Sequence, residues 1–347
     1  MSNHPKFALS IQAAATVIGY VFAVSGVIAQ EGKFNAPNTM SEEARRAVVQ
    51  FSGDRGTLPE PDDIEGWQKA QQATETSSEE GNQAVVAHYR PRITPRTLGG
   101  VPVLDIQPDG WRESNKVLVY THGGAYTLYS AESTLTSSVP VAHDTGLRVI
   151  SIDYTLAPHA RWNEITDQVI SVMQALVDEG HRLEDIAIYG DSAGGGLAAG
   201  VVLKMRDQGI GMPAAVVLWS PWSDITDDGD TYVTLLDHDP VLVYHNSLDR
   251  CADAYANPED QKHPYVSPVY GDYSQGFPPT LIQVGTKEIF LSNAVRHYQT
   301  LDNAGIEVKL DPYEGMWHVF QAFHWRLPES DLARKKMRTF LEQHMEQ

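Results

Sequence analysis

The chain has 347 residues with 45 acidic and 26 basic side chains, so its formal net charge is −19 and its isoelectric point lies near 5.0. This balance argues against nucleic acids, anionic membrane surfaces and polyanionic substrates as partners. The single cysteine, Cys251, excludes an intrachain disulfide, and no cysteine and histidine cluster has the spacing of a metal site. The length suits one large domain with a modest accessory region.

The first thirty residues have a composition of their own. After Lys6, residues 7–28 carry no charge and are rich in alanine, valine and isoleucine. This pattern predicts a signal peptide over residues 1–29, with Ala29 as the small residue before the cleavage point, and therefore a secreted or periplasmic protein. An uncleaved membrane anchor and an N-terminal helix packed on the rest of the protein are the alternatives.

Residues 30–97 form a second region, which we interpret as an N-terminal cap or linker. Ser41 precedes residues 42–49, where the sequence predicts a helix with a capping serine. An acidic stretch of low complexity follows at residues 74–80. A mobile lid over a functional site and a solvated surface linker are both consistent with this composition.

From residue 98 onward, apolar strands alternate with helical segments. Helices are expected at residues 193–208 and 293–303, and strands at residues 116–120, 149–153, 186–189, 215–219, 280–284 and 307–311. This alternation is typical of an α/β fold with a mostly parallel sheet covered by helices on both faces. We therefore assign residues 98–347 to one α/β domain.

A glycine pair follows the first of these strands, in the sequence His122-Gly123-Gly124. Glycines at the end of a strand allow an oxygen atom to approach the backbone amides to about 3 Å, because no side chain stands in the way. The run resembles the HGGG-type oxyanion loop of esterases and lipases, and this resemblance makes the amides of Gly123 and Gly124 candidate donors to a developing oxyanion. A plain β-turn is the alternative.

The strand predicted at residues 186–189 is followed by Gly-Asp-Ser-Ala-Gly at residues 190–194 and then by a helical segment. Strand, Gly-x-Ser-x-Gly turn and helix stand in the order of a nucleophile elbow, in which the serine hydroxyl is lifted clear of the sheet. Ser192 is thus the candidate nucleophile, and the amide of Ala193 is a third candidate oxyanion donor. We interpret Asp191 as structural. An ordinary turn with a capping serine is the alternative.

These motifs resemble those of the hormone-sensitive lipase-like group of α/β-hydrolases. The His-Gly-Gly loop, the Gly-Asp-Ser-Ala-Gly elbow and residues 153–158, Asp-Tyr-Thr-Leu-Ala-Pro, carry the resemblance, which spans residues 95–345. The chain departs from the group at residues 159–163, where many members continue with glutamate and a proline-containing run. The resemblance implies an α/β-hydrolase fold and carboxylesterase activity.

In an α/β-hydrolase, the acid and the base follow the nucleophile in that order along the chain. Glu288 lies in the loop after strand 280–284, where the family places its acid, and His318 lies in the loop after strand 307–311, which resembles the family's histidine loop. The competing acid Asp302 falls on a helix and is expected to be solvated. His297 and His324 are decoys that lack the context of a strand followed by a loop.

A polar stretch at residues 226–265 interrupts the alternation and is a second candidate cap. In or just before this stretch lie residues that could line an acyl pocket: Trp222, Tyr232, Leu235, Leu236, Val241, Leu242 and Tyr244. Aliphatic and aromatic residues at this spacing are more often part of the core. Cys251 lies in a predicted helix without an adjacent base, so we interpret it as a buried hydrophobic residue rather than a nucleophile.

The sequence thus predicts a serine hydrolase that cleaves esters of short to medium acyl chain with Ser192, Glu288 and His318. This chemistry needs neither a metal nor an organic cofactor. A lactone hydrolase with the same residues is the close alternative, and a non-catalytic ligand-binding protein of the same fold is the alternative from another class. The expected partner is a small ester or lactone. The oligomeric state stays open.

Overall fold

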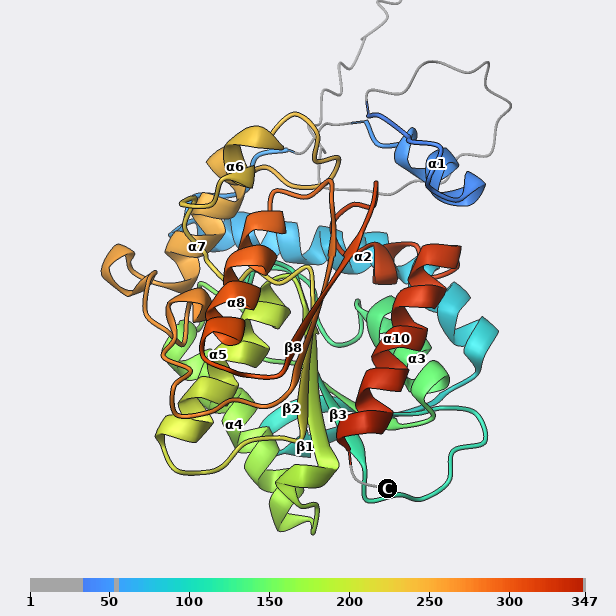
Figure 1. The fold of residues 1–347 in the computed structure, drawn as a ribbon, viewed down its shortest axis with the longest axis vertical. Coiled ribbons are helices and arrows are strands. Elements are labelled where there is room, and N and C mark those ends of the chain that lie inside the picture. The colour runs from blue at the N-terminus through green and yellow to red at the C-terminus, as the bar shows by residue number, and fades with distance from the viewer. Residues whose placement is uncertain (1–33, 53–55, 346–347) are drawn as a thin grey trace, which may run out of the picture.

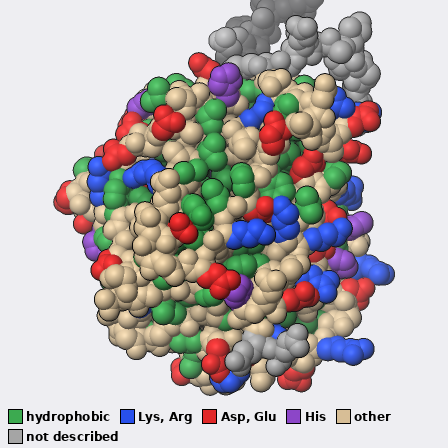
Figure 2. All heavy atoms as spheres, viewed as in Figure 1, with side chains coloured by type: hydrophobic (Ala, Val, Ile, Leu, Met, Phe, Trp, Pro, Cys, Tyr) green, Lys and Arg blue, Asp and Glu red, His purple; other side chains and the backbone are tan. Residues whose placement is uncertain are grey.

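A computed structural model describes residues 34–52 and 56–345, so the predicted signal peptide at residues 1–29 lies outside the described residues. The described chain forms one eight-stranded sheet in the order β1-β2-β4-β3-β5-β6-β7-β8, with helices on both faces (Figure 1). No helix within these ranges is both long and apolar enough to cross a membrane. Acidic side chains are scattered over the face seen in Figure 2 rather than gathered in one patch.

The six strands predicted from the sequence are confirmed, and they are parallel to one another. Their bounds are β3 Val117–Thr121, β4 Arg148–Ile152, β5 Ile186–Asp191, β6 Ala215–Trp219, β7 Thr280–Gly285 and β8 Val308–Tyr313. The central strands β3, β5, β6 and β7 are buried along their whole length, which explains their continuous apolar runs.

Two further strands at one edge of the sheet escaped the sequence analysis. β1 (Arg92–Leu98) and β2 (Val101–Gln107) form a hairpin, and β2 then pairs antiparallel with β4. Gly99 and Gly100 make the turn, and both have positive φ, which only glycine adopts without strain. β1 is an edge strand in which only Leu98 is buried, so it lacks the apolar pattern that reveals the inner strands.

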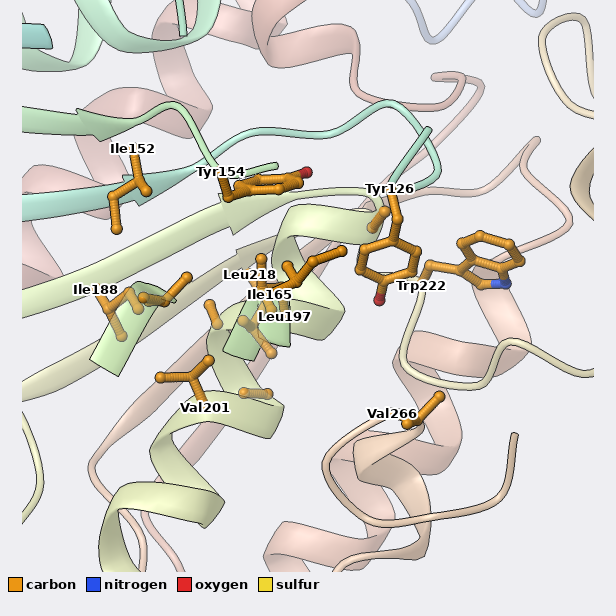
Figure 3. Packing of buried hydrophobic residues seen from close by; sticks show 14 of the residues in the cluster. Tyr126, Ile152, Tyr154, Ile165, Ile188, Leu197, Val201, Leu218, Trp222 and Val266 are labelled. Carbon is orange, nitrogen blue, oxygen red and sulfur yellow. The ribbon is translucent and has the colours of Figure 1, made fainter. Parts of the chain in front are cut away.

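The helices cover the sheet in two layers. α4 (Trp162–Asp178), α5 (Ala193–Asp207) and α8 (Leu291–Asn303) pack on one face through a core cluster that Figure 3 shows in part. α3 (Leu135–Thr145) and α10 (Pro328–His344) pack on the other face. Successive residues of β3 alternate between these clusters, as Val119 faces the first and Tyr120 the second. Two short helices, α6 (Thr231–Thr234) and α7 (Asp249–Tyr255), lie in the stretch 226–265.

The acidic stretch at residues 74–80, for which the sequence analysis predicted no helix, is helical. It lies inside α2 (Ile64–Tyr89), a helix of 26 residues that is capped by Asp63, whose carboxylate accepts the amide of Gly66 at 2.9 Å. Its buried residues recur at helical spacing, as Trp67, Ala70, Thr74, Asn82 and Val85. The charged and polar residues between them form the exposed faces and conceal this pattern.

The N-terminal end of the described chain packs beside the loop after β8. α1 (Glu42–Val48) is capped by Ser41, as predicted, and its side chain accepts the amide of Ala44. Phe34, Met40, Ala44 and Val48 share a small core with residues of β8, α10 and the short helix α9 (Phe320–Phe323). This packing places α1 close to the carboxyl ends of the strands (Figure 1).

The packing of α2 predicts a large cost for truncating Trp67, which is fully buried and donates its indole N–H to the carbonyl of Glu60 at 2.9 Å. We expect Trp67→Ala to lower the free energy of unfolding by about 3–5 kcal/mol, measured by urea denaturation. Lys69→Ala removes an exposed side chain of the same helix and should change it by less than about 0.5 kcal/mol. Equal, small effects of both variants would show that α2 is not part of the cooperative fold.

Candidate active site

Ser192 stands on a sharp turn between β5 and α5. Its backbone has φ 54° and ψ −124°, a conformation that is strained for any residue with a side chain. The turn is tight because a Cβ on Gly190 would lie 2.2 Å from the carbonyl oxygen of Gly194, and one on Gly194 would lie 2.0 Å from that of Thr121. The glycines of the motif are therefore required by the close approach of β3, β5 and α5, as an elbow demands.

The elbow opens into a cavity of about 700 Å³ at the carboxyl ends of the parallel strands. Ser192 is largely buried, and it lines this cavity together with His318, Gly123 and Gly124. Ligands of open α/β sheets bind at this edge. The glycine loop, the elbow serine and the histidine, which were predicted from separate parts of the sequence, therefore meet in one cavity.

His318 and Glu288 come from neighbouring strands, because the loops after β8 and β7 adjoin. The Nδ1 atom of His318 lies 2.8 Å from Oε2 of Glu288, and both side chains are almost completely buried. The Oε1 atom of Glu288 accepts the backbone amide of Gly285 at 2.5 Å and the hydroxyl of Ser220 at 2.8 Å. These bonds compensate the burial of the carboxylate and fix its orientation.

Ser220, which the sequence analysis missed, joins the two loops. Its hydroxyl donates to Glu288 and accepts the amide of Val319, the residue after His318, at 3.1 Å. Ser220 follows β6 and has a positive φ of 46°, so the chain turns sharply there. A serine at the carboxyl end of a central strand was the only signal in the sequence that could have identified it.

In the described chain no hydrogen bond joins the hydroxyl of Ser192 to His318, although both line the cavity. Catalytic hydrogen bonds are often absent or long in structures without a substrate and form when the substrate binds. The cavity thus brings together a hydroxyl and an imidazole that is bonded to a carboxylate, which are the groups that nucleophilic catalysis requires.

The glycine loop after β3 borders Ser192, and its amides differ in their partners. The amide of Gly123 donates to Oδ1 of Asp191 at 3.3 Å. The amides of Gly124 and Ala193 have no protein acceptor among the described residues, and Ala193 is the first residue of α5. Ala125, which the sequence analysis did not consider, lines the cavity beside them. The N-terminus of α5 carries a partial positive charge that favours an anion there.

The same loop has an unusually strained backbone. Ala125, Tyr126 and Tyr129 all have positive φ, at a cost of about 1–3 kcal/mol each. The side chain of Tyr126 compensates part of this cost, because its ring is fully buried and stacks on that of Tyr255 at a centroid distance of 3.6 Å. Figure 3 shows Tyr126 reaching toward Trp222 beneath the loop. The packing of Tyr126 in the core therefore holds the loop in place.

Asp191 is a buried structural residue, as interpreted from the sequence. Its carboxylate accepts the hydroxyl of Tyr120 and the amide of Gly123. Burial raises the pKa of Asp191 to about 6, although the hydrogen bond from Tyr120 and the charge of His318 oppose this shift. The residue thereby links β3, the glycine loop and the elbow.

The competing residues lie where no reaction at this cavity can use them, with one exception. Asp302 is exposed on α8, and His297 is buried in the core between Ser223 and Tyr273, with both nitrogens 2.8 Å from hydroxyl oxygens. His324 is the exception, since it lines the cavity.

Cys251 is fully buried in α7, and burial raises the pKa of its thiol to about 12, so it remains protonated. Its sulfur accepts the hydroxyl of Thr127 at 3.3 Å. This environment fits the predicted role of a small buried hydrophobic residue.

Both candidate caps contribute to the cavity. α2 supplies a wall that includes Gly81 and Asn82, and residues 241–243 supply another wall. Of the pocket residues considered from the sequence, Val241 and Leu242 line the cavity, whereas Trp222, Tyr232 and Tyr244 are buried in the main core.

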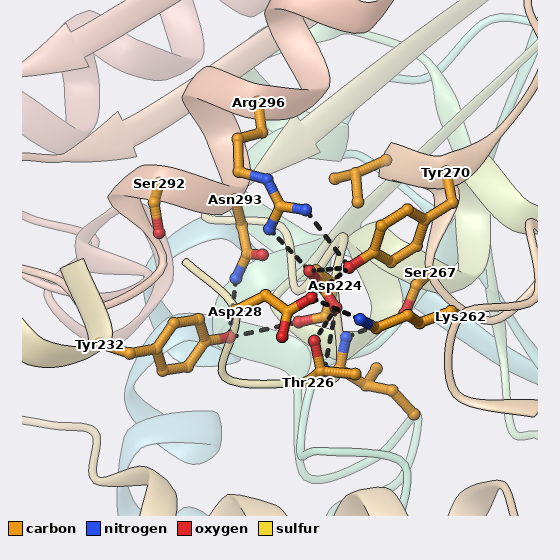
Figure 4. Close-up of polar contacts among 12 residues, drawn as sticks. Asp224, Thr226, Asp228, Tyr232, Lys262, Ser267, Tyr270, Ser292, Asn293 and Arg296 are labelled. Carbon is orange, nitrogen blue, oxygen red and sulfur yellow. Dashed lines mark hydrogen bonds and ion pairs between the residues drawn. The ribbon is translucent and has the colours of Figure 1, made fainter. Parts of the chain in front are cut away.

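A polar network anchors the start of the 226–265 segment. Asp224 is fully buried, and its carboxylate accepts Arg296 of α8 at 2.6 Å and the hydroxyl of Tyr270 at 2.9 Å (Figure 4). Lys262 and Asp228 extend the network toward the surface, and the hydroxyl oxygen of Tyr270, whose one proton is shared between the two aspartates, lies 3.0 Å from the carboxylate of Asp228. The pocket-lining residues 241–243 thus lie in a segment whose start is fixed to α8 and the main core.

Within the described ranges, no group of three or more histidine, cysteine, aspartate and glutamate side chains is arranged to hold a metal ion. The residues that surround Ser192 are instead a histidine, buried carboxylates and backbone amides.

Comparisons with known proteins bear on the fold and the activity of this chain. Residues 118–322 match a family model described as the α/β-hydrolase fold. An esterase of Acinetobacter venetianus is 34% identical over 243 residues, which cover 70% of this chain and 79% of that protein. An acetyl-hydrolase of Streptomyces hygroscopicus is 32% identical over 230 residues, 66% of this chain and 76% of that protein.

Solved structures agree with these relatives. The crystal structure of the esterase E25 superposes with a TM-score of 0.84 at 28% identity and covers 93% of this chain and 99% of that one. An esterase of the bacterial hormone-sensitive lipase family gives a TM-score of 0.77 at 27% identity, over 88% of this chain and 99% of that one. The resemblance drawn from the sequence motifs is thereby confirmed.

The bridging position of Ser220 predicts an effect on turnover. Ser220→Ala removes a hydrogen bond to the buried Glu288, so we expect kcat to fall roughly ten- to hundredfold, measured with a chromogenic ester. Ser223→Ala is the matched control, because Ser223 is equally buried but contacts His297 in the core. It should lower stability and leave kcat unchanged. A wild-type kcat in Ser220→Ala would show that the hydrogen bond from Ser220 is not needed to orient Glu288.

Burial of His297 predicts a loss of stability in acid. Desolvation lowers its pKa to about 3, below the unfolded value of 6.5, so its contribution to stability is present above pH 6.5 and is lost as the pH falls. We expect this residue alone to cost about 2 kcal/mol between pH 7 and pH 5. Urea unfolding of His297→Gln at both pH values should show a correspondingly smaller difference. The same pH dependence in both proteins would mean that His297 is hydrated in the fold.

Proposed function

The chain belongs to the α/β-hydrolase fold family and hydrolyses carboxylic esters, and we propose that it does so through an acyl-enzyme on Ser192. The observation that carries this assignment is the buried pair of His318 and Glu288, 2.8 Å apart, on the cavity that Ser192 lines. A serine hydroxyl is too weak an acid to attack an ester unaided, so a base beside it is required.

In the first half of the reaction His318 accepts the proton of Ser192 as the serine oxygen attacks the ester carbonyl. Glu288 holds the ring through Nδ1, which leaves Nε2 as the basic nitrogen, and stabilises the imidazolium that forms. The tetrahedral intermediate then collapses, and the imidazolium gives its proton to the departing alcohol. The acyl group remains on Ser192.

In the second half a water molecule replaces the alcohol. His318 takes a proton from this water, which attacks the acyl carbon, and returns the proton to the oxygen of Ser192 as that oxygen departs. The products are a carboxylic acid and the regenerated enzyme. The same groups thus act in both halves, and the proton count balances at each step.

The predicted oxyanion donors are the amides of Gly123, Gly124 and Ala193. Because the Gly123 amide already donates to Asp191, we assign the larger share to Gly124 and Ala193, whose amides are free of protein acceptors among the described residues. Donors of this kind contribute about 3 kcal/mol each to the transition state. The strained loop at residues 124–129 holds the amide of Gly124 in place before the substrate arrives, and the elbow and α5 hold that of Ala193.

We propose esters of short to medium acyl chain as substrates. A relative of this chain is named an acetyl-hydrolase, and the cavity of about 700 Å³ is of the size that small ligands occupy. Carboxylates at its wall, Asp191 among them, disfavour anionic substrates. Lactones would be opened by the same groups, and the substrate panel below includes them.

We further propose that residues 1–29 direct export and are removed. The support is the uncharged, apolar run at residues 7–28 before Ala29. Edman sequencing of protein expressed with its full N-terminus tests this proposal. A mature N-terminus near residue 30 supports it, and an intact N-terminus in the membrane fraction indicates an anchor instead.

Ser192→Ala is expected to lower turnover about a millionfold, because the nucleophile is lost. The measurement is hydrolysis of p-nitrophenyl esters from acetate to palmitate and of a set of simple lactones, with wild-type and variant protein. Activity on the shorter acyl chains, absent from the variant, supports the proposal. Full activity of Ser192→Ala would overturn it, and wild-type activity on lactones alone would reassign the substrate class.

A further inference from the structure

Besides Glu288 and Asp191, another buried carboxylate lies next to the site, and the proposed mechanism does not use it. Asp239, between α6 and α7, is fully buried. Its Oδ1 accepts the amides of Val241 at 2.7 Å and Leu242 at 2.9 Å, and its Oδ2 accepts the amide of Ile289 at 2.8 Å. Three backbone amides around one carboxylate form a fixed arrangement that stabilises its charged form.

These bonds join two parts of the site that are distant in sequence. Val241 and Leu242 line the cavity, so one oxygen of Asp239 holds a cavity wall. Ile289 follows Glu288 directly, so the other oxygen holds the loop of the proposed acid. The side chain of Asp239 therefore fixes the wall that contacts the substrate relative to the acid that orients His318.

Thr231 also contacts the loop of Glu288, but through an uncharged hydroxyl. Its hydroxyl donates to the carbonyl of Ile289, and it accepts the amide of Ser292 at 2.9 Å. Asp239 differs because it carries a negative charge next to the site. Burial raises its pKa to about 6, and the three amides and the charge of His318 oppose this shift.

The charged or titratable groups around Asp239 belong to three segments. Glu288 lies in the loop after β7 and His318 in the loop after β8, and both are buried. Asp237 and His238 belong to its own segment and are exposed, so solvent screens them. Of these groups, His318 is the one that is both buried and able to become positively charged in the reaction, so the charge of Asp239 acts on it.

We propose that Asp239 is a positioning residue of the reaction, which fixes the Glu288 loop against the cavity wall and adds, besides Glu288 and Asp191, a further negative charge near the imidazolium that forms on His318. This inference rests on the proposed roles of Glu288 and His318. An asparagine cannot reproduce the arrangement, because its amide group offers one acceptor oxygen where the carboxylate offers two. The charge is also lost.

The test compares Asp239→Asn with Asp224→Asn in the full-length protein. Asp224 is as buried as Asp239, but it pairs with Arg296 and has no bond to the Glu288 loop, so it is a matched control. We measure kcat and KM for p-nitrophenyl acetate from pH 5 to pH 9, and stability by thermal unfolding. Ser192→Ala is assayed alongside.

For Asp239→Asn we expect kcat to fall roughly tenfold or more, and the acid limb of the kcat/KM profile to move to lower pH, because protonated His318 has lost a stabilising charge. For Asp224→Asn we expect lower stability with the acid limb in its wild-type place. A lower kcat with an unmoved acid limb in Asp239→Asn overturns the proposal, since structural damage alone explains it. Equal shifts in both variants overturn it as well.

Asp239→Glu serves if Asp239→Asn fails to fold, because it keeps the charge but displaces it. We expect it to retain the acid limb and to lose kcat, and a wild-type kcat would overturn the positioning role. The outcome for Ser192→Ala separates the two hypotheses. If that variant stays active, the proposed function fails; if it is inactive and Asp239→Asn behaves as wild type, only the role of Asp239 fails.

Discussion

The site depends on the close approach of three backbone segments at the end of β5. A Cβ on Gly190 or Gly194 would lie within 2.2 Å of a carbonyl oxygen, so the elbow, the start of α5 and the end of β3 can meet only through glycine. Because β3 and β5 are neighbours in the sheet, this contact also places the glycine loop beside Ser192. The proposed nucleophile and the proposed oxyanion donors are therefore positioned by one constraint.

Burial shapes the electrostatics around this contact. Asp191 and Asp239 both have pKa values raised to about 6 by desolvation, above the unfolded value near 3.8. Groups of this kind contribute stability below pH 3.8 and lose it as the pH rises through 6, so at neutral pH both carboxylates cost folding energy. The hydrogen bonds that they accept from Tyr120, the glycine loop and the segment after Asp239 offset part of that cost. Retaining such groups beside a reaction centre is typical of functional sites.

The sequence predicted those elements whose physics is local. Inner strands are apolar throughout, and Ser192 sits in a motif that a sharp turn requires, so both were found. Glu288 and His318 were placed by the order of residues that the resemblance implies, and the structure brings them together. α2 was obscured because its buried face is interleaved with polar residues, and β1 because an edge strand has no apolar pattern. Ser220 and Asp239 were missed because their roles arise from contacts between distant loops, which periodicity does not encode.

The covalent intermediate on Ser192 is the central claim, and direct detection of a modified residue tests it best. The protein would be treated with a p-nitrophenyl phosphonate, which reacts as an ester analogue and stays bound to an activated serine, and then mapped by peptide mass spectrometry. Our account predicts one adduct, on Ser192, with its formation slowed by His318→Ala because the base is lost. An adduct on a different residue, or equal labelling of Ser192 without His318, would contradict the assigned nucleophile and base.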